Sequence, residues 1–215
     1  MPEHNRENFL QHQINYTSIS LLSNKIKVLI IGGGRAGFIK TKSFLKNGAM
    51  VTVLSKEFSP LFSSLPKENL SFIKDEYKEE FIVPYHLIVI VLEDHKVREE
   101  IKLHCEKQYK LYLDGTDFKE GMFVVPCQRS SRAINLSLNI KEGSPKTSIY
   151  LANKLINIAK DYDGFVDYCS KLRNRLKGNP LKEEILNFIN TDDFYFFFEK
   201  GSHNIVLKMF YGGEI

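Results

Sequence analysis

The stretch that decides the fold is KVLIIGGGRAGFIKTKSFLKNGAMVTVL, residues 27–54. Its first part, Lys27–Ile31, is an apolar run rich in β-branched residues, which is typical of a strand buried on both faces of a parallel sheet. Phe38–Asn47 has the pattern of a helix that ends at Gly48, and Val51–Leu54 is a second buried strand. The stretch therefore predicts a βαβ unit, whose crossover we expect to be right-handed.

The loop between this first strand and the helix matches the pattern G-x-G-x-x-G. In this pattern Gly32 allows the tight turn, Gly34 lets the backbone approach a pyrophosphate, and Gly37 lets the helix pack on the strand. The amides of Arg35 and Ala36, which open the helix, face phosphates with the positive end of the helix dipole. We therefore expect this loop to bind a dinucleotide, the alternative being a purely structural glycine turn.

The end of the second strand predicts less about which dinucleotide binds. Many proteins with this loop carry an acidic residue there, which binds the ribose hydroxyls. Here the position is held by Ser55, with Lys56 and Glu57 beyond it. NAD and NADP both stay open, because Ser55 and Lys56 would not repel a 2′-phosphate.

The chain beyond this unit alternates between predicted strands and helices. His86–Leu92 is the strongest strand in the sequence. The helix expected between Glu93 and Tyr109 places Val97, Ile101 and Cys105 on one apolar face, so we interpret Cys105 as a core residue. The weaker predictions are a short helix over Glu76–Phe81 and strands over Tyr16–Leu22, Leu70–Lys74, Leu111–Leu113, Phe123–Val125 and Ala133–Ile140.

The last third of the chain has a different character. Ser144-Pro145 is a helix opening, with a serine N-cap before a proline at the first helical position. Apolar periodicity then indicates helices that carry Ile149 to Ala159, Phe165 to Leu176, and Leu181 to Phe198. The tail from Ser202 onward shows no clear preference for helix or strand.

Together these patterns predict an α/β fold with a Rossmann-type parallel sheet, followed by a short β segment and a small C-terminal helical domain. The expected domains are a loose N-terminal tail over residues 1–15, a Rossmann NAD-binding domain over 16–122, a β connecting segment over 123–143 and the helical domain over 144–215.

Composition excludes several classes of protein. The chain has 215 residues, 43% of them hydrophobic and 26% charged, which is ordinary for a globular protein and unlike collagen, disordered chains or disulfide scaffolds. Its 3 cysteines, Cys105, Cys127 and Cys169, are too widely spaced for a zinc pair or a CxxC motif. Without an apolar run of about 18 residues or an apolar leader, we expect a cytoplasmic protein with no membrane span, and we expect no resident metal.

The net charge of +4 does not predict a nucleic-acid partner. The local charge pattern is more informative, because no acidic residue occurs between Glu7 and Glu57 or between Glu120 and Glu142. If these two stretches meet in space, they form a cleft that attracts a polyanion. The alternative is a set of solvated lysines on ordinary helix faces.

The chain also carries an ordered set of motifs around and beyond the glycine loop. They are YTSISLLSNKIKVLIIGGG (16–34), GRAGFIKTKSFLKNGAMVTVLS (34–55), HLIVIVLEDHKVREEI (86–101), LYLDGTDFKEGMFVVP (111–126), EGSP (142–145) and SKLRNRLKG (170–178). In this order the segments resemble the precorrin-2 dehydrogenase and sirohydrochlorin ferrochelatase family, which includes the N-terminal half of siroheme synthase. The glycine loop is shared by many folds, whereas the order of the segments is much more specific.

This resemblance implies an enzyme that oxidises precorrin-2 to sirohydrochlorin with NAD, and that in some members also inserts ferrous iron. Fe²⁺ or Co²⁺ would then be a chelation substrate only. The resemblance also implies a homodimer, in which residues 123–143 are a dimerisation element. A basic cleft would suit the substrate, because this tetrapyrrole carries many carboxylates.

The same resemblance implies the site residues. Anchoring on Leu111–Leu113 and Phe123–Pro126 places Asp117 at the family's catalytic aspartate and Asp114 at a family asparagine. An aspartate there would accept a proton as hydride leaves the macrocycle, or pyrrole protons as a metal enters; the alternative is an Asx turn in D-G-T-D. The implied cofactor-binding residues are Gly32, Gly33, Gly34, Arg35, Ala36, Gly37, Ser55, Leu92 and Glu93, and the implied substrate-binding residues are Lys40, Arg129, Arg132 and Ser144.

Some positions depart from the family pattern. Ile39 replaces an arginine, Arg98 replaces an asparagine, and Lys141-Glu142 replaces a pair of glycines. Two other functions therefore stay open. The chain could be a nucleotide-binding sensor or degenerate relative without dehydrogenase activity, or a metal chelatase that needs no nucleotide.

Overall fold

The computed structural model describes residues 15–141 and 143–212. The chain divides into two compact units, Met1–Val125 and Pro126–Ile215, and each is described by itself. The loose tail predicted over residues 1–15 lies outside the described residues, apart from Asn15.

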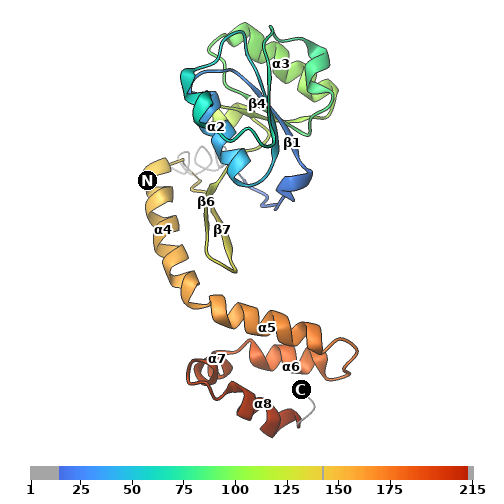
Figure 1. Ribbon diagram of the computed structural model, residues 1–215, viewed down its shortest axis with the longest axis vertical. Coiled ribbons are helices and arrows are strands. Elements are labelled where there is room, and N and C mark those ends of the chain that lie inside the picture. The colour runs from blue at the N-terminus through green and yellow to red at the C-terminus, as the bar shows by residue number, and fades with distance from the viewer. Residues whose placement is uncertain (1–14, 142, 213–215) are drawn as a thin grey trace, which may run out of the picture. The chain divides into compact units, whose positions relative to one another are not determined.

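The first unit is built around a five-stranded parallel sheet with the strand order β3-β2-β1-β4-β5 (Figure 1). This confirms the predicted Rossmann-type sheet, because β1 lies at the centre and the strand order reverses beside it. The strands are β1 (Lys27–Ile31), β2 (Met50–Leu54), β3 (Leu70–Ile73), β4 (Leu87–Ile90) and β5 (Leu111–Asp114). The helices are α2 (Arg35–Lys46) and α3 (His95–Lys107), with short 3₁₀ helices η1 (Ser23–Lys25), η2 (Pro60–Ser64), η3 (Glu79–Ile82) and η4 (Phe118–Glu120).

Strand β1 is buried on both faces, as its apolar sequence predicts. Val28 and Ile30 pack in the apolar cluster on the α2 side of the sheet, and Leu29 and Ile31 pack in the cluster on the α3 side. None of these side chains is more than 2% exposed, and burial of each stabilises the fold by about 1.5–3 kcal/mol. Cys105 of α3 is buried in the second cluster, which confirms it as a core residue.

The second unit begins with an antiparallel hairpin of β6 (Cys127–Ser130) and β7 (Asn135–Leu138). Asp163 fixes the hairpin loop, since its carboxylate accepts hydrogen bonds from the Ser131 hydroxyl at 2.7 Å and the Ala133 amide at 2.9 Å. Helix α4 lies along this hairpin (Figure 1). The helices of this unit are α4 (Pro145–Asp161), α5 (Asp163–Arg175), α6 (Lys182–Ile189), α7 (Asp192–Glu199) and α8 (His203–Tyr211).

Two predicted strands are wrong. Tyr16–Leu22 forms no regular structure, because its side chains are mostly exposed and the edges of the sheet are β3 and β5. Phe123–Val125 is also irregular. The amide of Phe123 donates to the Tyr112 carbonyl at 3.3 Å, but no ladder follows, and the next strand begins at Cys127.

Two predicted helices are wrong in extent or type. The helix expected over Leu181–Phe198 is in fact α6 and α7, because the Thr191 hydroxyl accepts a hydrogen bond from the Phe194 amide and so starts a new helix. The helix expected over Glu76–Phe81 is the 3₁₀ turn η3. Among the described residues, no helix has the length and apolar character needed to cross a membrane.

Candidate dinucleotide and catalytic site

The predicted cofactor residues converge because the strands before them are parallel. Gly32 follows β1, Ser55 follows β2, Leu92 comes shortly after β4, and Gly115 follows β5. The loops are joined to neighbouring strands, since the Gly32 amide donates to the Leu54 carbonyl at 2.9 Å and the Gly115 amide donates to the Ile90 carbonyl at 2.8 Å. In open α/β sheets, ligands bind at this carboxyl edge, where the strand order reverses.

The glycines of the loop have different tasks. A β-carbon at Gly37 would lie 2.0 Å from the Gly32 carbonyl oxygen, and one at Gly33 would lie 2.1 Å from the Glu57 carbonyl oxygen. Gly32 has a φ of 128°, which favours glycine, and a β-carbon there would lie 2.4 Å from the Val91 carbonyl oxygen. These glycines are therefore required by packing of the protein on itself.

Gly34 is different, because nothing lies within 4 Å of a β-carbon built on it. Gly34, Arg35 and Ala36 are exposed, whereas Gly33 and Gly37 are buried. Helix α2 begins here with no side-chain cap on its amides and no acidic residue in its first turn. An open glycine beside an uncapped helix N-terminus fits a dinucleotide pyrophosphate.

The other predicted cofactor residues border this loop. The Ser55 hydroxyl would lie 2.8 Å from a β-carbon at Gly33, so it is packed against the glycine loop. Lys56 is exposed and forms an ion pair with Glu76 at 2.6 Å. Leu92 is half-buried, and its neighbour Glu93 is exposed.

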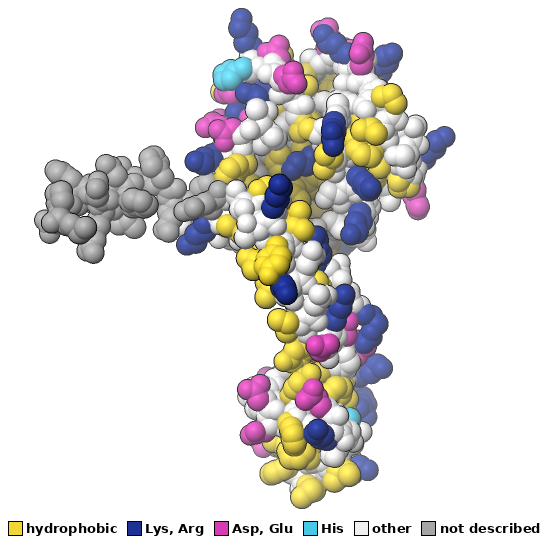
Figure 2. All heavy atoms as spheres, turned by 90° about the vertical axis from the view of Figure 1, so that its left-hand side faces the viewer, with side chains coloured by type: hydrophobic (Ala, Val, Ile, Leu, Met, Phe, Trp, Pro, Cys, Tyr) yellow, Lys and Arg dark blue, Asp and Glu magenta, His cyan; other side chains and the backbone are white. Residues whose placement is uncertain are grey.

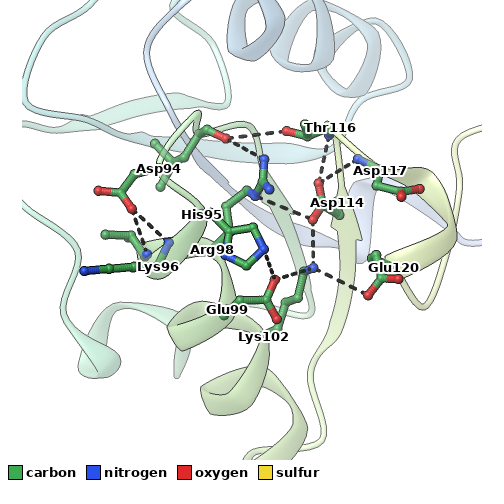
Figure 3. Close-up of polar contacts among 12 residues, drawn as sticks. Asp94, His95, Lys96, Arg98, Glu99, Lys102, Asp114, Thr116, Asp117 and Glu120 are labelled. Atoms are coloured by element: carbon green, nitrogen blue, oxygen red, sulfur yellow. Dashed lines mark hydrogen bonds and ion pairs between the residues drawn. The ribbon is translucent and has the colours of Figure 1, made fainter.

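Asp114, at the end of β5, is the most buried charged group of this edge, with a side chain that is 1% exposed (Figure 3). Its Oδ1 accepts hydrogen bonds from the amides of Thr116 at 2.8 Å and Asp117 at 3.1 Å. Its Oδ2 lies 3.0 Å from the Lys102 ammonium, in an ion pair whose angles are poor for a hydrogen bond. The D-G-T-D segment is therefore an Asx turn closed by Asp114.

These contacts keep Asp114 ionised. Burial alone would raise the pKa of Asp114, but the Thr116 amide, Lys102 and the Asp117 amide outweigh it, so the pKa lies below its ordinary value. Burial likewise opposes the charge of Lys102, yet Glu99 and Asp114 raise the pKa of its ammonium. Both groups are therefore charged at neutral pH.

Asp117 has the opposite environment. Its side chain is exposed and caps the short helix η4 by accepting a hydrogen bond from the Lys119 amide at 3.0 Å. Its own amide is held by Asp114, as described above. The structure thus brings the two predicted aspartates together, with one buried in the turn and the other exposed at its end.

The predicted substrate-binding residues are distributed over both units. Lys40 lies on α2 and is half-buried, and burial lowers the pKa of its ammonium. In the second unit, the Arg129 Nε donates to Asn153 Oδ1 at 2.6 Å, Arg132 is paired with Asp167, and the Ser144 hydroxyl contacts the Thr147 hydroxyl at 2.7 Å. Among the departures, Ile39 and Lys141 are exposed, and Glu142 lies outside the described residues.

Figure 2 shows one face on which lysine and arginine side chains of the first unit lie among hydrophobic ones, with acidic side chains toward its upper end. In the part of the chain that the structure describes, no group of His, Cys, Asp and Glu side chains is arranged to hold a metal ion.

Sequence reasoning missed Lys102. It belongs to the same side of α3 as Arg98, one turn away, and both lie along one border of the apolar positions Ile101 and Cys105. Buried charges are paired, so two cations at this spacing beside a buried stripe are a signal in the sequence for a buried carboxylate such as Asp114.

Comparison with known proteins agrees with this geometry. A model of the NAD_binding_7 family, described as NAD(P)-binding, matches residues 19–127. The precorrin-2 dehydrogenase of Priestia megaterium is 26% identical over 173 residues, which cover 78% of this chain and 85% of that protein. The siroheme synthase of Acinetobacter baylyi is 21% identical over 189 residues, which cover 79% of this chain and 41% of that protein.

A solved structure of SirC, a precorrin-2 dehydrogenase, has the same fold, with a TM-score of 0.63 and 22% identity over 82% of this chain and 90% of that one. The family match spans the glycine loop, both aspartates and all of the parallel sheet. The resemblance predicted from the ordered motifs is confirmed: the chain belongs to the NAD_binding_7 family of NAD(P)-binding proteins and is a divergent relative of the precorrin-2 dehydrogenases.

Proposed function

We propose that this protein is an NAD-dependent precorrin-2 dehydrogenase, which forms sirohydrochlorin on the route to siroheme. The observation that carries the proposal is the match to precorrin-2 dehydrogenase over 78% of the chain, together with a glycine loop in which Gly34 faces open space. NAD is the cofactor we favour, and NADP is the alternative, because Ser55 and Lys56 carry no negative charge at the end of β2.

The chemistry divides between the cofactor and the protein. NAD, when bound, accepts a hydride from the macrocycle. Oxidation removes two hydrogens, so the second must leave as a proton while its bonding electrons remain in the ring. The protein's part is to hold the pyrophosphate at Gly34, Arg35 and Ala36, to orient the macrocycle, and to accept that proton.

Asp117 is the residue we propose as general base. Its carboxylate is exposed at the carboxyl edge of the sheet, where a substrate can reach it. Asp114 is a poor candidate, because its oxygens are occupied by two amides and by Lys102. Asp114 fits better as the residue that fixes the backbone of Asp117.

Lys40, Arg129, Arg132 and Ser144 remain proposed contacts for the substrate carboxylates. Arg132 is paired with Asp167 and Arg129 with Asn153, so a substrate would have to replace or share these partners. The alternative functions make different predictions: a nucleotide-binding relative would bind NADH without oxidising precorrin-2, and a chelatase would insert Fe²⁺ or Co²⁺ without nucleotide.

We also propose a homodimer formed through the second unit. Helix α4 exposes an apolar row at the spacing of helical turns, Leu151, Leu155 and Ile158. Figure 2 views the side on which α4 lies in Figure 1 and shows hydrophobic side chains gathered there. The domains are proposed as Rossmann over 16–122, dimerisation segment over 123–143 and helical domain over 144–215.

The proposed location is the cytoplasm, where thiols such as those of Cys105, Cys127 and Cys169 stay reduced. The test of the function is an anaerobic incubation of the purified protein with precorrin-2 and NAD. Joint appearance of NADH and sirohydrochlorin supports the dehydrogenase. Binding of NADH with no product supports the nucleotide-binding relative instead.

A further inference from the structure

Two cations of α3 are largely buried at the carboxyl edge of the sheet without belonging to the glycine loop. The side chains of Arg98 and Lys102 are 12% and 7% exposed. They lie one helical turn apart and point toward the loops that follow β4 and β5 (Figure 3). A buried lysine is costly unless it has partners, so its presence here requires an explanation.

Lys102 is connected to the proposed base through one carboxylate. Its ammonium lies 2.9 Å from Glu99 Oε1 and 3.0 Å from Asp114 Oδ2. The other oxygen of Asp114 holds the amides of Thr116 and Asp117. Removing the lysine charge would take away the nearer of two cations that pair with the buried Asp114 carboxylate, and would so weaken the anchor of the turn that orients Asp117.

Arg98 joins the same turn to the loop after β4. Its Nη1 donates to the Leu92 carbonyl at 3.4 Å, and its Nε lies 3.9 Å from Asp114 Oδ2. The Thr116 hydroxyl reaches the same Leu92 carbonyl at 3.5 Å. Leu92 lies in the loop after β4, which belongs to the proposed cofactor site and is called the cofactor loop here. Arg98 and Thr116 therefore fix the distance between this loop and the loop after β5 that carries Asp117.

We propose that Lys102 and Arg98 are positioning residues: through Asp114 and the Leu92 carbonyl, they set the distance between the cofactor loop and the carboxylate of Asp117. This role rests on the proposed function, in which the two loops hold the hydride acceptor and the proton acceptor. Neither cation touches the substrate in this account. Their effect on turnover is transmitted by the backbone of the two loops.

The test compares Lys102→Met with Lys102→Arg, which keeps the charge, and with Lys107→Met, which removes an exposed lysine from the end of the same helix. For each variant we would measure the melting temperature, kcat, the KM for NAD and the Kd for NADH. We expect Lys102→Met to lose about tenfold or more in kcat and several-fold in NADH affinity, at a temperature where it is fully folded. Lys102→Arg should restore most of both, and Lys107→Met should match the wild type.

A purely structural lysine gives a different result. It would lower the melting temperature of Lys102→Met while kcat and NADH affinity of the folded protein stayed at wild-type values, and that would overturn the proposal. If Lys102→Met does not fold, the double variant Lys102→Met, Asp114→Asn removes both members of the buried Lys102–Asp114 ion pair and keeps an amide oxygen as acceptor for the turn. Recovery of folding with kcat still reduced supports positioning, and recovery of both overturns it.

Failure of the proposed function is distinguishable from failure of this inference. If the wild type binds NADH but leaves precorrin-2 unchanged, the dehydrogenase proposal fails. The NADH affinity of Lys102→Met relative to Lys107→Met then still decides whether the network positions the cofactor loop. Equal affinities would overturn it.

Discussion

The substitution Gly34→Ala separates ligand binding from folding at the glycine loop. Gly34 has a φ of −80°, which alanine adopts without strain, and a new β-carbon meets no atom within 4 Å. The methyl group would instead occupy the open space beside the α2 N-terminus, where the pyrophosphate is proposed to approach the backbone. We therefore expect a folded protein that has lost its dinucleotide site.

The magnitudes follow from the local geometry. As the N-cap of α2, alanine costs a few tenths to about 1 kcal/mol relative to glycine, and the smaller entropy of the unfolded chain offsets about 0.4–1 kcal/mol of that cost. The melting temperature should thus move by less than about 4 °C. The control Gly37→Ala places a β-carbon 2.0 Å from the Gly32 carbonyl oxygen and should destabilise the fold by about 1–3 kcal/mol or more.

The assay is calorimetric titration of NADH into each folded variant, with thermal unfolding measured in parallel. Gly34→Ala should bind NADH at least about tenfold more weakly than the wild type, a loss of about 1.4 kcal/mol of binding free energy. Wild-type affinity in Gly34→Ala would refute the assignment of this loop to the pyrophosphate. A large fall in its melting temperature would refute the claim that Gly34 faces open space.

Three further predictions test separate parts of the account. Asp117→Asn should lower kcat by about a hundredfold or more while the Kd for NADH stays unchanged, and stopped-flow turnover close to wild type would exclude Asp117 as the base. Because the pKa of Asp114 is lower in the folded protein than in the unfolded chain, its carboxylate stabilises the fold above about pH 4, and this contribution disappears as the pH falls through the folded pKa. Asp114→Asn should therefore melt at a lower temperature than the wild type at neutral pH, and this difference should shrink in acid. A difference in melting temperature that is independent of pH would contradict a lowered pKa of Asp114. Leu155→Glu on the exposed row of α4 should give monomers by light scattering, whereas Asn157→Glu, an exposed polar position of the same helix, should not; dimers in both variants would place the interface elsewhere.

The parts of the fold that sequence predicts well are those set by local patterns. The continuous apolar run Val28–Ile31 and the apolar helix face of Ile101 and Cys105 predict burial from local sequence, and both are in the core. Tyr16–Leu22 has strand-like residues but no strand to pair with, which only the completed sheet reveals. The break at Thr191 depends on one hydroxyl bonding one amide, and a run of apolar residues on both sides conceals it.

The candidate site likewise has parts that local sequence predicts and parts that it does not. The glycine spacing predicts the loop, but it does not show that a β-carbon would meet open space at Gly34 and the protein's own backbone at Gly37. The motif D-G-T-D predicts both a turn and a base, and only the three-dimensional contacts assign the turn to Asp114. The ion pair between Asp114 and Lys102 joins β5 to α3, so no local pattern around the aspartates contains it.

The most direct test of the central claim is a quantitative anaerobic reaction of wild-type protein with precorrin-2 and NAD, with Gly34→Ala as the matched control. A dehydrogenase forms NADH and sirohydrochlorin in equal amounts in the wild type and far more slowly in the variant. Sirohydrochlorin that forms at the same rate without NAD, or no product from a wild type that binds NADH, would contradict the account.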